Sequence, residues 1–293
     1  MKAGTISRGI RTVPKKGAGF IDIAGLSIRI EGDAGDLPLV EVSSRTSARH
    51  VVEFVDMRKE PVRESCLRDK NGEWFIALKK EGHCVSVLGG KKKEVDIGRF
   101  DLSSGKGYFN YYSDALKEAL FPPFLRVLFQ MFTIFSGGFC VHSSGVVWKK
   151  KGYLFSGPSG SGKTTVASLA PKGARTLSDE YIAVKPHKGK FRMYSTPWRL
   201  VTEGMGELEG IFFLAKSKKI MFERLSRARA IMMLLPNVLY NLDDKELMSR
   251  VFRTADDLLS KVPAYMMHFP VDKAVWEKIE IVGADPCLPA EAC

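Results

Sequence analysis

The first part of the chain alternates apolar and polar residues with a period of two. The alternation is clear over residues 20–30, 73–78 and 83–88, and turn residues separate these segments, among them Asn71-Gly72. A period of two indicates half-buried β-strands, and Asn-Gly is a typical hairpin turn. We therefore predict a β-rich N-terminal module over residues 1–113.

The pattern then changes to one that favours helices and buried strands. Apolar residues recur near helical spacing over residues 114–135, although Pro122-Pro123 should break or kink that helix. A buried strand or strand pair is predicted over residues 139–148, and a shorter strand over 153–156. Prolines, glycines and an arginine interrupt the apolar stretch at 120–141, so we predict a buried helix and strand there and no membrane span.

The most specific motif follows the short strand, and it reads Gly157-Pro158-Ser159-Gly160-Ser161-Gly162-Lys163-Thr164. This is a complete G-x-x-x-x-G-K-[ST] pattern, the Walker A motif or P-loop, and a helix-forming segment begins at Thr165. In such a loop, backbone N–H groups point inward around phosphates, the lysine reaches the β- and γ-phosphates, and the threonine hydroxyl binds Mg²⁺. We predict that residues 157–165 bind ATP, with Mg²⁺ as the metal cofactor and Thr164 as one of its ligands.

An acid pair, Asp179-Glu180, follows Lys163 after only 16 residues. That spacing fits the loop, a short helix, a turn and a short strand, and it would bring both carboxylates beside the γ-phosphate. An apolar segment at residues 181–184 follows directly and predicts a strand, which favours a functional position over a surface turn. By contrast, the apolar segment at residues 210–216 has no carboxylate at its end.

The segment from His142 to Val184 resembles the P-loop fold shared by HPr kinase/phosphorylase and phosphoenolpyruvate carboxykinase. That superfamily has a histidine before the P-loop strand, then the P-loop, then a paired acid, and all three occur here in order. Later segments resemble the HPr-kinase-like proteins in particular: a turn at 194–198, a core strand at 208–214, a helix at 225–235 and a late edge strand at 262–266.

This resemblance implies a fold class. We expect an α/β protein in which a P-loop domain of the HPr kinase/phosphoenolpyruvate carboxykinase type, a mixed sheet with flanking helices, occupies residues 114–282. The β-rich module would precede this domain, and a flexible tail would follow it at residues 283–293.

The resemblance also implies roles for individual residues. Asp179 matches the first acid of the pair, the general base that takes the proton from an acceptor hydroxyl. Glu180 matches the second acid, usually aspartate, which would help to hold Mg²⁺. His142 matches the superfamily's histidine and would contact the base or line the acceptor site; a satisfied core histidine is the alternative. Arg199 is our candidate cation near the transferred group, with a solvated surface arginine as the alternative.

The function implied is ATP- and Mg²⁺-dependent transfer of the γ-phosphoryl group to a serine hydroxyl of a peptide or small protein. HPr-kinase-related serine kinases are better relatives than true HPr kinases, because the G-R-N-containing signature of the latter is absent. Two alternatives stay open: a nucleotide-binding regulatory protein without phosphotransfer, and a reversible kinase/phosphorylase. HPr kinases are hexameric, so the resemblance also suggests a homo-oligomer.

Composition and charge limit the class of protein, the partners and the cellular compartment that we expect. With 293 residues, of which 45% are hydrophobic, the chain is not of the disordered class. The net charge is +12, and the basic C-terminal half of the chain would suit an acidic peptide acceptor, whereas no basic motif with interleaved aromatics predicts nucleic-acid binding. Five cysteines without C-x-x-C spacing fit neither a zinc site nor a disulfide framework, and free thiols fit a reducing compartment. No secretory signal is recognised after Met1, so we expect a cytoplasmic protein.

Overall fold

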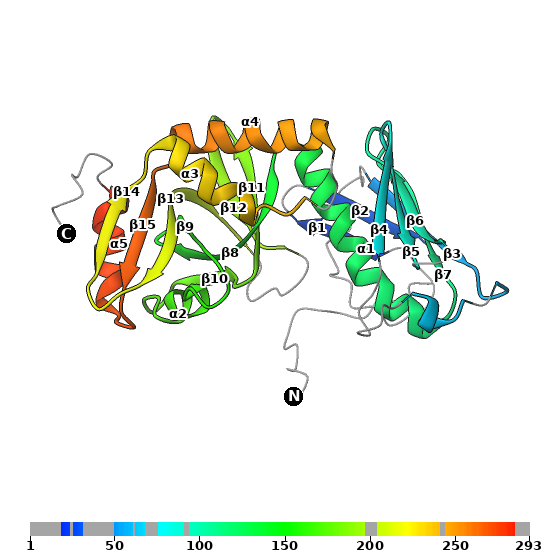
Figure 1. Ribbon diagram of the computed structural model, residues 1–293, viewed down its shortest axis with the longest axis horizontal. Coiled ribbons are helices and arrows are strands. Elements are labelled where there is room, and N and C mark those ends of the chain that lie inside the picture. Colours follow the sequence, from blue (N-terminus) through cyan, green and yellow to red (C-terminus); the bar gives the residue numbers. More distant parts are fainter. Residues whose placement is uncertain are drawn as a thin grey trace. The chain divides into compact units, whose positions relative to one another are not determined.

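A computed structural model of the chain describes residues 19–23, 26–31, 50–60, 62–67, 76–90, 94–196, 204–240 and 244–284. It divides into two compact units, Met1–Phe132 and Thr133–Cys293. Each unit contains a β-sheet with both parallel and antiparallel strand pairs, and helices accompany the sheets (Figure 1). The chain is therefore an α/β protein with mixed sheets. The domain boundary predicted between residues 113 and 114 stays a prediction.

The first unit contains a seven-stranded sheet in the order β1-β2-β3-β7-β6-β5-β4. The strands are β1 (Gly19–Ile23), β2 (Leu26–Glu31), β3 (His50–Asp56), β4 (Ile76–Glu81), β5 (Cys84–Gly89), β6 (Val95–Asp101) and β7 (Lys106–Tyr111), and a short 3-10 helix, η1, spans Glu64–Cys66. β1, β2 and β5 lie where the period-two alternation predicts strands. The predicted hairpin turn at Asn71-Gly72 falls outside the described residues.

Helix α1 (Asp114–Phe135) continues through Pro122 and Pro123, so these prolines do not break the helix; the alternative, a kink, stays a prediction. Its aromatic residues pack on the sheet on both sides of the prolines: the ring of Phe121 lies 5.0 Å from that of Phe54, and the ring of Phe124 lies 5.2 Å from that of Phe109. Burial of these rings holds the helix on the sheet across the point where hydrogen bonds are lost.

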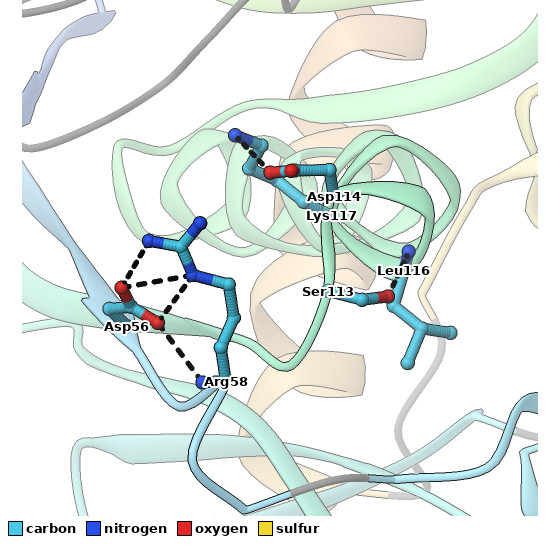
Figure 2. A network of polar contacts seen from close by, with 6 residues as sticks. All are labelled: Asp56, Arg58, Ser113, Asp114, Leu116 and Lys117. Atoms are coloured by element: carbon cyan, nitrogen blue, oxygen red, sulfur yellow. Dashed lines mark hydrogen bonds and ion pairs between the residues drawn. The ribbon is translucent and has the colours of Figure 1, made fainter.

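The beginning of α1 is fixed by polar contacts (Figure 2). The hydroxyl of Ser113 accepts a hydrogen bond from N of Leu116 at 3.1 Å, which is how serine caps a helix. Nearby in the same unit, hydrogen bonds from Arg58 lower the pKa of Asp56 to about 2. The cap explains why the helical pattern starts where the sequence predicts it.

The length and hydropathy of α1 would suffice to cross a membrane, and among the described helices it alone meets that test. However, 61% of the 18-residue segment of α1 that meets this test is buried inside the protein. A core helix has the same composition, and α1 is followed by a buried strand. The helix and strand predicted from the apolar stretch at residues 120–141 are therefore both present in the structure.

The second unit contains an eight-stranded sheet in which β10-β8-β11-β12-β13-β15-β14 are neighbours and β9 pairs with both β8 and β13. The strands are β8 (Phe139–Trp148), β9 (Lys151–Ser156), β10 (Arg175–Ser178), β11 (Tyr181–His187), β12 (Lys190–Tyr194), β13 (Met205–Lys216), β14 (Met221–Arg224) and β15 (Ala264–Phe269). The helices are α2 (Lys163–Ser168), α3 (Arg227–Leu234), η2 (Leu235–Asn237), α4 (Lys245–Lys261) and α5 (Ala274–Ala284).

The core of the second unit supports the segment that follows β9. The rings of Phe155 and Phe212 lie 5.5 Å apart, and Trp276 of α5 lies 5.5 Å from Phe155. The indole N–H of Trp276 also donates a hydrogen bond to O of Val166 at 2.9 Å. This hydrogen bond connects α5 to α2, so α5 fixes the short helix that follows β9 to the core of the unit.

Two element predictions in this unit are wrong. The segment at 262–266 was predicted as an edge strand, but β15 lies between β13 and β14. β14 (Met221–Arg224) was not predicted at all, and the helix expected at 225–235, α3, starts only after its N-cap, Ser226. Both errors have one cause: pairing with β15 makes four residues a strand, and four residues are too few to show a period. Of the predicted turn at 194–198, residues 197 and 198 fall outside the described residues, and so do residues 285–293 of the predicted tail; residues 283 and 284 belong to α5.

Candidate functional site

Three glycines hold the loop between β9 and α2 in a curled conformation. Gly157, Gly160 and Gly162 have φ angles of 154°, 77° and 107°, which residues with side chains rarely adopt. Gly162 also lacks room for a side chain, because a Cβ there would lie 2.8 Å from Cζ of Phe269. Backbone conformation and packing thus explain why glycine occupies these positions.

Lys163 and Ser161 place buried polar groups in this loop. The Nζ of Lys163 donates hydrogen bonds to O of Gly157 at 2.7 Å and to O of Pro158 at 3.1 Å. Burial lowers the pKa of this amine below its usual value. The hydroxyl of Ser161 is buried and has no hydrogen-bond partner among the described residues. Oxygen atoms of an anion bound at the loop would be further acceptors for the Lys163 amine.

A cavity of about 370 Å³ lies beside the loop and brings most of the predicted site residues together. It is lined by His142, Ser159, Gly160, Gly162, Lys163, Thr164, Thr165, Asp179, Glu180 and Lys216. Residues from the loop, from the acid pair, and from β8 and β13 therefore share one space. Gly157, Pro158 and Ser161 belong to the loop but do not line this cavity.

Asp179 and Glu180 lie between two strands that pair with the same edge of β8. β10 and β11 both run antiparallel to β8, and the register of the pairing continues from one strand to the other. Residues 175–184 therefore follow β8 as one ladder with an irregularity between Thr176 and Ser178, and the acid pair comes directly after that irregularity. An irregularity of this kind is a common way to redirect side chains at a site.

Hydrogen bonds fix the backbone of the acid pair. The buried hydroxyl of Ser178 accepts hydrogen bonds from N of Glu180 and N of Tyr181, both at 3.2 Å. On the neighbouring strand, N of Ser143 donates a hydrogen bond to O of Glu180 at 3.0 Å. The position of the carboxylates relative to β8 is thus set by buried contacts on both sides.

The same strand, β8, also positions the start of the loop. Val146 and Val147 pair with both β9 and β10, so these two strands lie on opposite edges of β8. Ser143 pairs with Ser156, the last residue of β9, immediately before the loop begins. One strand therefore separates the acid pair from the start of the loop.

His142 lies on β8 in the wall of the cavity and is only partly buried, so it is not a core histidine. It pairs with Tyr181, and the two rings are 5.7 Å apart. Burial lowers the pKa of His142, the positive charge of Lys163 lowers it further, and Glu180 opposes the shift. The imidazole is therefore neutral at pH 7 and can accept a hydrogen bond.

Lys216 is the site residue that the sequence analysis missed. It ends β13, which runs parallel to β9 with Phe213 beside Ser156, so the end of β13 reaches the loop. Two signals pointed to it: the strand that ends without a carboxylate, and the basic residues at 216–219. Neither could place the amine without the register of β13 against β9.

The donor set fits a magnesium ion better than a self-contained metal centre. The cavity offers the hydroxyl of Thr164 and the carboxylates of Asp179 and Glu180. No group of three or more His, Cys, Asp or Glu side chains that could hold a metal occurs among the described residues. Mg²⁺ commonly binds through one or two carboxylates together with substrate phosphates and water, so these residues fit it. Arg199, which we predicted as a cationic side chain near the transferred group, lies outside the described residues.

Comparison with solved structures finds the "Hpr(Ser) kinase/phosphatase from Coxiella burnetii", with a TM-score of 0.31 and 11% sequence identity. The match covers 50% of this chain and 99% of that one. Similarity of this degree does not identify an activity. Comparison with curated proteins finds no match.

A protein-family model described as "SynChlorMet cassette protein ScmC" matches residues 124–283. The matched segment begins within α1, ends within α5 and contains every residue that lines the cavity beside the loop. It covers more than half of the chain. The chain therefore belongs to the SynChlorMet cassette protein ScmC family.

Proposed function

We propose that this chain is an ATP- and Mg²⁺-dependent kinase of the HPr-kinase-like type, which transfers the γ-phosphoryl group of ATP to a serine hydroxyl of a peptide or protein. The observation that supports this most is the shared cavity, which is lined by the P-loop residues and by Asp179 and Glu180. Phosphoryl transfer requires groups that bind phosphate and, beside them, a group that can accept a proton. The residues that line this cavity are candidates for both roles.

The loop would bind the phosphates of ATP. Its curled backbone presents N–H groups, and Lys163 would exchange the carbonyls of Gly157 and Pro158 for phosphate oxygens. Lys216 adds a second cation to the same cavity. Thr164 and Glu180 would hold Mg²⁺, which neutralises charge on the phosphates when it is bound.

Asp179 would serve as the general base. It accepts the proton of the acceptor hydroxyl while the hydroxyl oxygen bonds to the γ-phosphorus, and the bond from that phosphorus to the bridging oxygen of ADP breaks. His142, neutral because of its lowered pKa, would accept a hydrogen bond from the acceptor or from its surroundings without competing for phosphate. Positioning and charge therefore supply most of the catalysis.

The test is incubation with γ-labelled ATP, Mg²⁺ and a host-cell extract. We expect label on a peptide or protein, enriched in acidic residues to match the chain's net charge of +12. Lys163→Ala should abolish labelling through loss of phosphate binding, and Asp179→Asn should abolish it while ATP still binds. Asp257→Asn, a matched change at an exposed helix residue, should leave labelling intact. Undiminished transfer by Asp179→Asn would show that Asp179 is not the base.

A second candidate is a nucleotide-binding regulatory protein without phosphotransfer. It is favoured by one observation: β13, the strand parallel to β9, ends in Lys216 rather than in a carboxylate. This candidate predicts tight ATP binding and no labelled product. Release of pyrophosphate from a phosphorylated acceptor on addition of inorganic phosphate would instead identify a reversible kinase/phosphorylase.

A further inference from the structure

A second cavity, of about 420 Å³, adjoins the one beside the loop. The two share Gly162, Thr165 and Lys216 in their linings. The rest of the second cavity is formed by Ser217-Lys218 and by residues 269–271. Phe269, Pro270 and Val271 make one wall apolar, whereas the first cavity is lined mainly by polar and charged residues.

The wall of this second cavity is built by the sheet. β13 and β15 run parallel, with Lys216 beside Phe269, so the two wall segments leave the ends of neighbouring strands. N of Ser217 donates a hydrogen bond to O of Phe269 at 3.1 Å, which holds the two segments together beyond the strands. The aromatic ring of Phe269 lies so close to Gly162 that a side chain there would not fit. The apolar wall therefore lies directly against the phosphate loop.

The positions of Asp179, Lys163 and Thr165 determine in which direction a bound triphosphate would run along the first cavity. If the γ-phosphate lies by Asp179 and Lys163 contacts the β- and γ-phosphates, the α-phosphate lies towards the start of α2. Thr165 is in the first turn of that helix and lines both cavities. The part of the nucleotide beyond the α-phosphate therefore faces the second cavity.

From this arrangement we infer that the second cavity binds the nucleoside moiety of the nucleotide. The inference rests on the proposed function, in that it requires a triphosphate at the P-loop. The apolar wall suits the face of a base, and lysine side chains can cover a ring with their aliphatic stems while their amines donate to ring nitrogens. Val271 is apolar and 78% exposed, so its side chain is accessible to a ligand in this cavity.

The experiment compares two ligands that share the triphosphate but of which only one carries the nucleoside, Mg²⁺-ATP and Mg²⁺-tripolyphosphate. The quantity measured by titration calorimetry is the ratio of the tripolyphosphate dissociation constant to that of ATP. Val271→Asp should lower this ratio at least fivefold, because it places a solvated charge on the apolar wall. The effect of the added charge on the phosphates acts on both ligands and largely cancels in the ratio.

Ile281→Asp is the matched control. Ile281 lies in α5, is 54% exposed and does not line the cavity, so the same charge change should leave the ratio unaltered. A ratio in Val271→Asp within twofold of the wild-type value would overturn the inference. So would equal affinity of the wild-type chain for the two ligands, although phosphate binding would then stand. If the wild-type chain bound neither ligand, the proposed function would fail together with the inference.

Discussion

Gly162 offers a quantitative test of how the loop is held, because it has a matched partner in Gly160. Both glycines have positive φ angles, but only Gly162 has an atom in the way: a Cβ would lie 2.8 Å from Cζ of Phe269, whereas nothing lies within 4 Å of a Cβ at Gly160. The difference between Gly162→Ala and Gly160→Ala therefore isolates the packing of the Phe269 ring against the loop.

The magnitudes follow from these contacts. A side chain in the left-handed region costs about 1–2 kcal/mol, and that strain is the whole expected loss in the free energy of unfolding for Gly160→Ala. Displacing a buried ring adds about 1–3 kcal/mol. We therefore expect Gly162→Ala to lose about 3 kcal/mol and to bind nucleotide poorly, because the ring cannot move without disturbing β15.

The assay is urea unfolding followed by circular dichroism, with ATP binding measured on the same variants. Phe269→Leu removes the obstructing Cζ, so in that background the cost of Gly162→Ala should fall to that of Gly160→Ala. The reasoning is refuted if Gly162→Ala costs no more than Gly160→Ala. It is also refuted if the cost of Gly162→Ala is the same with Phe269 and with leucine.

Three further predictions concern residues that line or support the same cavity. Lys216→Met should lower the phosphoryl-transfer rate about 100- to 1,000-fold, as loss of one group that stabilises developing charge does, while Lys219→Met should not; steady-state kinetics on the identified acceptor would decide. Ser178→Ala should cost about 1–3 kcal/mol in urea unfolding, since N of Glu180 and its neighbour lose their acceptor, and Ser178→Thr should restore most of it. The lowered pKa of His142 means that the unfolded chain binds its proton more readily than the folded chain. The contribution of His142 to stability is therefore complete above pH ~6.5 and lost as the pH falls towards the lower folded pKa. His142→Gln should weaken the dependence of the free energy of unfolding on pH below pH ~6.5. An unchanged dependence would contradict the lowered pKa of His142.

Local patterns predicted the loop and the acid pair. The Walker A motif and the short distance from Lys163 to Asp179 are both contained within one stretch of chain, so no long-range register was needed to expect them in one cavity. His142 was placed in the same stretch by resemblance. Strand pairing with β8 then brings these three parts together.

Features that depend on long-range pairing were not predictable. Lys216 reaches the cavity only because β13 pairs with β9, which is distant in sequence. The apolar wall at residues 269–271 likewise depends on the pairing of β15 with β13. Helix α1 was misjudged for a related reason: Pro122-Pro123 is a strong local signal, and tertiary burial of the surrounding aromatic residues overrides it.

The single strand between the acid pair and the loop has a consequence for how this site can change. Glu180 and Ser156 lie on opposite edges of β8 beside Ser143, and neighbouring strands are about 4.8 Å apart, so their backbones are roughly 10 Å apart. A hydrogen-bonded sheet does not widen or narrow gradually. The gap across which a carboxylate acts is therefore adjustable only through side-chain length, and the glutamate at 180 reaches one methylene further than an aspartate would while the chemistry of the group is the same.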